Sequence, residues 1–359
     1  MTNRRRIIDT LLCKPVDRPP FPMWLGFAPW GEALERWRAE SGIADLDVTR
    51  YFGFEPFCVG VQVEYGPFPH FEQKVLDEND KFVTAVDWRG IVMRNRKDGC
   101  SMPEFVRHPI GGPGDWKRYK EERLQPRLDE RLARLGETLE EAKTVDAHVQ
   151  AGTFPWGVFG TARDLLGAEE LLLAFYDYPE MVRDIMETNV SLWISLYEKI
   201  QEKIQIDHIH IWEDMSGRQG SLISMDMVKD FMMPCYDRVA EFARAHGVPL
   251  ISVDSDGRVD ELVEVMHPHG VNAFFPFEVQ AGCDVELVRS KYPKLGIMGG
   301  LDKNALARGK PEINRELDRA ERMFARGGYI AGFDHLIPEN VPWENYKYFV
   351  EHLKRIIGL

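Results

Sequence analysis

The stretch PLISVDSDGRVDELVEVMHPHGVNAFFPFE, residues 249–278, contains the repeating unit that decides the fold. A short apolar run over 249–253 predicts a buried strand, and apolar residues at helical spacing over 259–266 predict the helix that follows it. A second apolar run over 271–275 predicts the next strand. Short strands that alternate with helices in this way are typical of a parallel sheet covered by its crossover helices.

The same unit recurs from residue 145 to the end of the chain. Six strands, each with a following helix, are predicted there at 148–152, 206–212, 249–253, 271–275, 295–300 and 328–332. Two earlier apolar runs, 21–26 and about 55–60, complete a set of eight, which predicts an α/β fold of the closed (β/α)8 TIM-barrel type. No GxGxxG sequence follows any of these strands, so an open doubly wound sheet with a dinucleotide site is the less favoured alternative.

One segment interrupts this rhythm. Alternating apolar and polar residues at 82–88 and 91–94, around Arg89-Gly90, predict a β-hairpin. Residues 115–143 are highly charged, as exposed helices are. We therefore expect an N-terminal insertion of a hairpin and helices over about 60–143. The whole chain, 1–359, is then a single barrel domain, because barrels with insertions reach this length.

The composition limits the classes of partner. The chain carries 45 basic and 58 acidic residues, a net charge of −13, which suits nucleic-acid phosphates poorly. The five cysteines are scattered without a CxxC pair. No stretch approaches the roughly 18 consecutive apolar residues of a membrane span. These features predict a cytoplasmic protein with a small-molecule ligand and without nucleic-acid or membrane partners, and they leave a homodimer open.

Acidic residues follow every late strand, at the end where barrel enzymes carry their catalytic groups. Asp254 and Asp256 are two residues apart, so an extended backbone points both side chains the same way. Carboxyl groups held close together raise a pKa or bind a cation. Capping of the following helix explains a single acid, as at Asp302, but explains such a pair poorly.

The candidate site combines these acids with a histidine and with aromatic residues of the same barrel mouth. The expected catalytic residues are Asp254, Asp256, Glu213 and His335. The expected substrate-binding residues are Trp24, Phe27, Trp30, Trp212, Asp214 and Asp334. A divalent ion such as zinc is expected on Asp254, Asp256 and His335. His208 and His210 alternate along one strand toward the barrel interior and are interpreted as core histidines with satisfied hydrogen bonds.

Several motifs resemble the uroporphyrinogen decarboxylase-like superfamily over nearly the full length. They are RIIDTLL at 6–12 with PVDRPP at 15–20, GTARDLLG at 160–167, Glu213-Asp214 with SLIS at 221–224, GGLD at 299–302, and GFDH at 332–335 with Ile337-Pro338. The resemblance implies a TIM barrel and one of two chemistries. Decarboxylation of uroporphyrinogen, in porphyrin biosynthesis, uses an arginine-rich stretch after the first strand, where this chain has WLGFAPWG at 24–31. An acidic protein with an uncharged aromatic mouth is a poor host for a substrate with eight carboxylates.

The second chemistry is that of corrinoid-dependent methyltransferases, which the chain resembles more. The members that activate thiols carry zinc ligands, His and Cys after strand 5 and Cys after strand 8, at the positions of Asp254, Asp256 and Phe333. Carboxylates here form a harder site, and a thiol acceptor is not expected. The resemblance implies a methyltransferase of one-carbon metabolism that moves a methyl group between a small methylated or methoxylated compound and a corrinoid on a separate protein. A carboxyl group or a metal ion then activates the leaving atom, and uroporphyrinogen decarboxylation is the alternative function.

Overall fold

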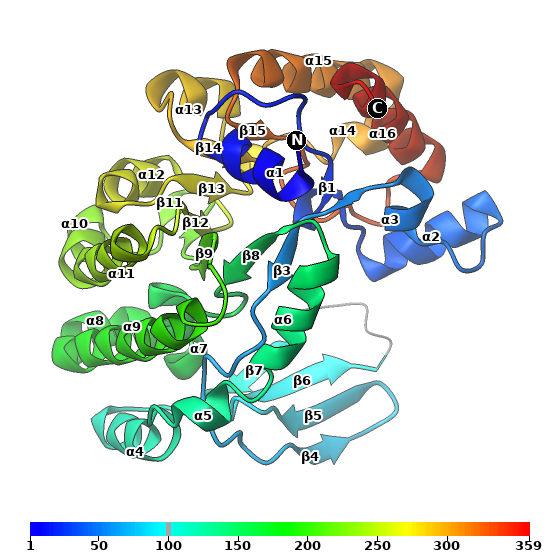
Figure 1. Cartoon of the computed structure of the whole chain (residues 1–359). Coiled ribbons are helices and arrows are strands. Elements are labelled where there is room, and N and C mark those ends of the chain that lie inside the picture. Colours follow the sequence, from blue (N-terminus) through cyan, green and yellow to red (C-terminus); the bar gives the residue numbers. More distant parts are fainter. Residues whose placement is uncertain (98–101) are drawn as a thin grey trace.

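The computed structural model describes residues 1–97 and 102–359, and its centre is a ring of parallel strands surrounded by helices (Figure 1). Seven strands form one parallel sheet in the order β15-β14-β13-β12-β9-β8-β3. Their bounds are Cys58–Gly60 for β3, His148–Ala151 for β8, His208–Trp212 for β9, Leu250–Asp254 for β12, Ala273–Phe275 for β13, Gly296–Met298 for β14 and Tyr329–Ile330 for β15. The remaining strand, β1 (Pro22–Met23), pairs with β2 (Glu55–Pro56), which leads into β3.

The ring closes between its first and last strands, beyond their regular parts. Pro29 forms a parallel bridge with Ile337, and the Phe333 N–H donates to the Gly26 carbonyl at 2.8 Å. The expected (β/α)8 barrel is therefore confirmed, with a short and irregular first strand. Within the described residues no helix is long and apolar enough to cross a membrane.

The helices of the repeating units lie outside the barrel because each crossover between parallel strands places its helix on the outer face. They are α2 Gly31–Ser41, α3 Val48–Phe52, α7 Val158–Leu166, α8 Ala168–Asp177, α9 Pro179–Gln201, α10 Met225–Met227, α11 Met233–His246, α12 Asp260–Met266, α13 Val285–Lys291, α14 Ala305–Arg308, α15 Lys310–Arg326 and α16 Trp343–Ile357. A small antiparallel ladder, β10 (Ser216–Gly217) with β11 (Gly220–Ser221), follows β9.

The expected insertion lies between β3 and β8. Four antiparallel strands pair in the order β4-β5-β6-β7, and three helices follow them. The bounds are β4 Lys74–Glu78, β5 Phe82–Val86, β6 Val92–Arg96, β7 Glu104–Arg107, α4 Pro113–Arg123, α5 Leu128–Arg131 and α6 Leu135–Thr144. The predicted hairpin is β5 with β6, in which Phe82 pairs with Arg96 and Val86 with Val92. The two outer strands were not predicted, because β4 and β7 are exposed along their whole length and show no alternation of buried and exposed residues.

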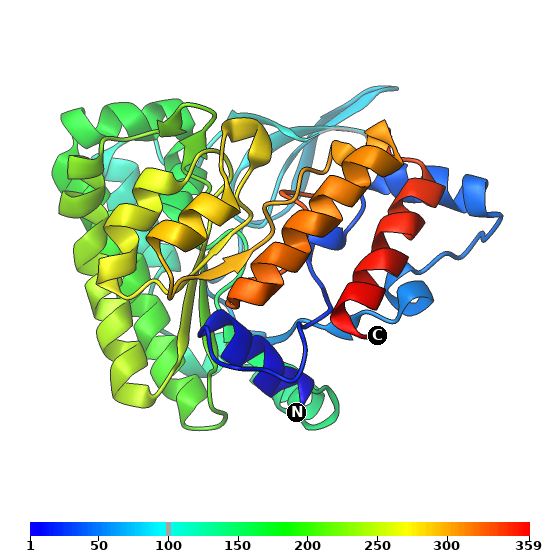
Figure 2. The same cartoon turned by 90° about the horizontal axis from the view of Figure 1, so that it is seen from above.

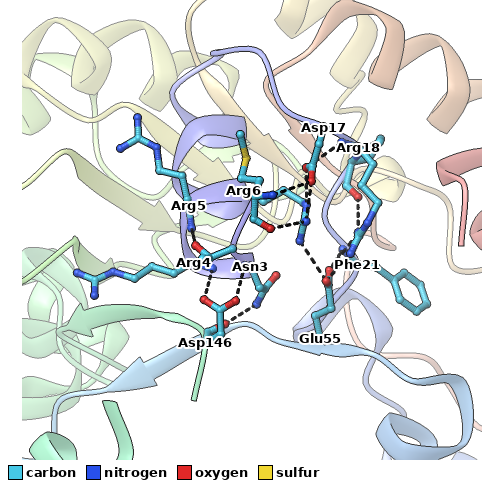
Figure 3. A network of polar contacts seen from close by, with 12 residues as sticks. Asn3, Arg4, Arg5, Arg6, Asp17, Arg18, Phe21, Glu55 and Asp146 are labelled. Carbon is cyan, nitrogen blue, oxygen red and sulfur yellow. Dashed lines mark hydrogen bonds and ion pairs between the residues drawn. The ribbon is translucent and has the colours of Figure 1, made fainter. Parts of the chain in front are cut away.

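The amino-terminal end of the barrel is covered by α1 (Asn3–Leu11), which contacts β8, β14 and β15. In Figure 3 the Arg6 guanidinium binds Asp17 at 2.8 and 2.9 Å and Glu55 at 3.2 Å. The backbone N–H groups of Asn3 and Arg4 donate to the Asp146 carboxylate at 2.6 and 3.1 Å (Figure 3). Figure 2 shows α1 at one end of the barrel and the strands of the insertion toward the other, open end.

Candidate active site

The candidate active site lies at the carboxyl ends of β12 and β15. Asp254 is the last residue of β12, Asp256 follows two residues later, and His335 comes after β15. The Nε2 atom of His335 lies 3.6 Å from the Oδ2 atom of Asp256. The ring of Trp30 stacks on that of His335, with 6.3 Å between the ring centroids. Four residues predicted from distant parts of the sequence therefore lie at one mouth.

Both carboxyl groups of the pair have raised pKa values. Burial raises the pKa of Asp254 well above its usual range, and the charges of Asp256 and Asp214 raise it further. The pKa of Asp256 is raised to about 7, by burial first and then by Asp214 and Glu278. Burial and the nearby charge of Lys303 lower the pKa of His335. At neutral pH Asp254 is therefore protonated and Asp256 is close to half protonated, beside a neutral imidazole, an arrangement that can donate a proton.

Glu213 lies away from the mouth. Its side chain is fully buried and accepts hydrogen bonds from the backbone N–H groups of residues 158, 159 and 160, at 3.0, 2.7 and 3.0 Å, and from the Tyr236 hydroxyl at 2.6 Å. These N–H groups open α7, whose amino-terminal end attracts a carboxylate. The close approach depends on Gly160, since a Cβ there would lie 2.3 Å from the Trp212 carbonyl oxygen. Glu213 therefore positions α7, and its expected catalytic role stays a prediction.

The other two acids of the predicted site also bind neighbouring segments. Asp214 has a positive φ of 41° and accepts from Arg163 at 2.6 Å through Oδ2. The same guanidinium lies 5.0 Å from the centroid of the Trp212 ring. Asp334 is fully buried and accepts from the backbone N–H groups of Val279 and Lys303 at 3.0 and 3.1 Å. Asp334 thus joins the loops that follow β13 and β14, which border the mouth.

The predicted aromatic residues divide between the mouth and the core. Trp30 is 39% exposed, and Trp212 packs edge to face on the exposed Phe154 with 4.7 Å between the ring centroids. Trp24 is buried and its Nε1–H donates to the Ala331 carbonyl at 3.0 Å. Phe27 is 1% exposed and is surrounded by core rings. Trp24 and Phe27 are therefore buried, and their expected contact with substrate stays a prediction.

Several residues of this mouth were not among the predicted set. A cavity of about 280 Å³ adjoins Asp256 and is lined in part by Arg218 and Glu278. The Lys303 ammonium lies 3.8 Å from Glu278 and 3.5 Å from Asp334. Glu278 lies in the loop after β13 and Lys303 in the loop after β14, so their place in these loops could have identified them. Lys303 was missed because the prediction considered only acidic residues in these loops.

The predicted metal ligands do not have the arrangement of a metal site. Across residues 1–97 and 102–359, no group of three or more His, Cys, Asp or Glu side chains could hold a metal ion. Asp254, Asp256 and His335 therefore lack the common focus that a bound ion requires. Zinc binding by these three residues stays a prediction.

The chain is similar to known proteins in sequence and in fold. The family model described as uroporphyrinogen decarboxylase (URO-D) matches residues 90–356. A methyltransferase from Methanosarcina mazei has a similar structure over 99% of this chain and 99% of that chain, with a TM-score of 0.59 and 17% sequence identity. A xylanase of glycoside hydrolase family 10 from Gloeophyllum trabeum covers 64% of this chain and 83% of its own, at 12% identity and a TM-score of 0.37, which is too low to support an argument. No curated protein sequence matches the chain. The first likeness agrees with the barrel fold.

Proposed function

Because the chain belongs to the uroporphyrinogen decarboxylase family, we propose that it is a methyltransferase-like enzyme acting on a small methylated or methoxylated compound. Its partner in methyl transfer is a corrinoid carried by a separate protein. The observation that carries the proposal is the carboxyl pair Asp254 and Asp256 beside His335, since the raised pKa values supply a proton donor at neutral pH. The likeness in fold to a methyltransferase is compatible with this reaction, although one fold serves many reactions.

Each residue of the mouth has a distinct part in the proposed reaction. Trp30 and Trp212 hold the apolar surface of the substrate. Asp256 gives its proton to the oxygen or nitrogen atom that leaves as the bond to the methyl carbon breaks, so the leaving group departs without added negative charge. A reduced corrinoid on the separate protein would accept the methyl group as this bond breaks, and its cobalt would supply the electron pair of the new bond. His335, 3.6 Å from Asp256, then passes a proton from solvent to the carboxylate.

Decarboxylation of uroporphyrinogen is the alternative that the same family membership raises. The substrate of that reaction carries eight carboxylates and needs several free cations. In this chain Arg163 binds Asp214 at 2.6 Å, and Lys303 lies between Glu278 and Asp334. The segment 24–31, where the resemblance implies arginines, contains none. An anaerobic assay with uroporphyrinogen is expected to give no coproporphyrinogen, and measurable conversion would favour the decarboxylase.

The methyltransferase is tested by anaerobic incubation with free reduced cobalamin and a panel of methoxylated and methylated compounds. Formation of methylcobalamin is followed by absorbance. The Asp256→Asn variant is expected to lower kcat by about 100-fold or more, because general acid catalysis contributes at least that factor. Asp318→Asn, on the exposed side of α15, is the matched control and is expected to keep full activity. Equal rates in Asp256→Asn and in the control would overturn the proposed mechanism.

A zinc ion on Asp254, Asp256 and His335 is the alternative source of the same activation. Two carboxylates and an imidazole are suitable ligand types, but the proton-donor route requires no movement of these side chains. Elemental analysis of protein purified without chelator decides between the two. We expect less than about 0.1 equivalent of any metal, since binding needs ligands with a common focus. A full equivalent of zinc that is lost in Asp254→Asn would establish the metal route instead.

A further inference from the structure

A chain of four hydrogen-bonded side chains runs through the barrel interior beneath the carboxyl pair. The Nε2 atom of His148 lies 3.1 Å from Nδ1 of His208, and Nε2 of His208 lies 2.6 Å from the Ser252 hydroxyl. The same hydroxyl lies 3.0 Å from Nδ1 of His210. These residues come from the neighbouring strands β8, β9 and β12. Three imidazoles linked in series inside an apolar barrel are costly to bury, so the arrangement calls for an explanation.

The strand register places one end of this chain below the mouth. His210 pairs with Ser252, and the next pair on the same inward face is Trp212 with Asp254. Residues two apart on a strand point to the same side and are about 7 Å apart along it. His210 therefore lies one such step deeper than Asp254, while His148 lies nearer the amino-terminal end that α1 covers.

His210 differs from the other members of the chain in its exposure. His148, His208 and Ser252 are fully buried, whereas His210 keeps 7% of its surface exposed. Its Nδ1 atom is bound to Ser252, and within the described residues Nε2 has no hydrogen-bond partner. The ring stacks on Phe275 with 5.3 Å between centroids and 17° between planes. Stacking fixes the ring, so Nε2 is held at the one member of the chain that is still accessible. The other ring nitrogen of these four side chains that lacks a partner in the described part of the protein, Nδ1 of His148, is fully buried.

The protonation state of the chain follows from its burial. Burial lowers the pKa of His210 to about 4 and that of His148 to about 3, and it lowers the pKa of His208 well below its usual value. All three rings are therefore neutral at pH 7, and each has one N–H and one lone pair. When His148 donates to His208, each following link donates in turn and Nε2 of His210 carries a hydrogen. When every link reverses, Nε2 offers a lone pair.

We propose that His210 is a further substrate-binding residue, which hydrogen-bonds through Nε2 to a neutral oxygen group of the substrate. This oxygen group is separated from the methylated atom of the substrate by about the length of one aromatic ring. The identity of the substrate as a methoxylated compound rests on the proposed function. A hydroxyl group suits the site in particular, because it can accept or donate and so match either polarity of the chain. A carboxylate does not suit it, because a charge would be buried against a neutral ring without a counterion. Ser252 acts as a positioning residue through its bond to Nδ1.

Two probes that differ in one hydroxyl group test this inference. We expect 4-methoxyphenol to bind roughly tenfold more tightly than methoxybenzene, since a buried, well-paired hydrogen bond contributes about 1.4 kcal/mol. His210→Phe keeps a ring that stacks on Phe275 but is expected to bind both compounds equally. His210→Gln, which restores a polar group, is expected to recover part of the preference, and His352→Phe on α16 is the control that retains it.

A spectroscopic readout separates this inference from the proposed function. In protein with ¹⁵N-labelled histidine, 4-methoxyphenol is expected to shift the ring-nitrogen signals of His210 and to leave those of His148 nearly unchanged. Ser252→Ala is expected to change the tautomer ratio of His210 even without ligand. Equal affinity of the two probes for the unmodified protein, or a preference that survives in His210→Phe, would overturn the role of His210 while leaving methyl transfer intact. Failure of both probes to bind would refute the proposed substrate class together with this inference.

Discussion

Replacing Asp256 by Asn should stabilise the folded protein, and the gain should grow as the pH rises. The pKa of Asp256 is raised from 3.8 to about 7 in the folded state, so between these values the folded protein binds a proton that the unfolded chain has lost. Stability contributed by the protonated group is complete below about pH 4 and is lost as the pH rises through about 7. An Asn side chain does not titrate, so the Asp256→Asn variant does not lose stability in this way as the pH rises.

The magnitude follows from the size of the shift and the exposure of the group. A change of about 3 pKa units corresponds to about 4 kcal/mol, of which somewhat more than half falls between pH 5 and pH 8. The Asp256 side chain is 38% exposed, and solvent screens interactions of such a group strongly. We therefore expect Asp256→Asn to gain about 1 kcal/mol relative to the unmodified protein between pH 5 and pH 8.

Urea unfolding at pH 5, 6, 7 and 8 measures this difference directly, because the midpoint multiplied by the slope gives the free energy of unfolding. Asp318→Asn, which removes an exposed acid of α15, should show no such trend. A difference between Asp256→Asn and the unmodified protein that stays constant over this pH range would show that Asp256 is ionised throughout. The carboxyl pair could then not serve as a proton donor.

Three further changes test buried contacts, one in the insertion and two at α7. Arg131 is fully buried and donates to the carbonyl groups of residues 64, 66, 123 and 125. Arg131→Met should therefore lower the free energy of unfolding, measured with urea, by about 3 kcal/mol. A decrease below about 1 kcal/mol would contradict this expectation. Gly160→Ala should be insoluble or should lower the free energy of unfolding by about 3 kcal/mol, because the added Cβ meets a backbone oxygen. Gly136→Ala, with open space around the added Cβ, is the control and should leave the free energy of unfolding unchanged or raise it. Glu213→Gln places an amide N–H₂ among N–H donors and should lower the thermal midpoint by several degrees; an unchanged midpoint would show that these bonds add nothing to stability.

The barrel could be predicted because its strands are short and rich in apolar residues, and because segments with helical periodicity separate them. The capping explanation for the single acid Asp302 was wrong in detail, because Asn304 is the N-cap of α14 and Asp302 instead accepts from the Asn304 N–H at 2.9 Å in the preceding turn. The outer strands of the insertion could not be predicted in the same way. β4 and β7 bury neither face, so nothing in their sequences distinguishes them from exposed loops.

The different structural roles of Glu213 and Asp214 could not be predicted from the sequence. The two acids are adjacent, and their side chains leave the backbone in different directions. One meets the first turn of α7 and the other meets Arg163, both about fifty residues earlier in the chain. The local pattern gave two acids at a strand end, but the partners that decide their roles are set by tertiary packing. The same holds for His210, whose inward direction was predicted and whose unpartnered nitrogen was not.

Phe333 connects the loss of thiolate ligands with the chemistry of the carboxyl pair. The resemblance implies a zinc-binding cysteine at this position in thiol-activating methyltransferases. Here the side chain is fully buried, with its ring 4.5 Å from that of Phe349 and 6.4 Å from that of Phe27. It therefore belongs to the core and not to the set of polar side chains at the mouth. Burial raises the pKa values of Asp254 and Asp256, so the two carboxyl groups at the positions where the resemblance implies soft ligands are suited to proton donation.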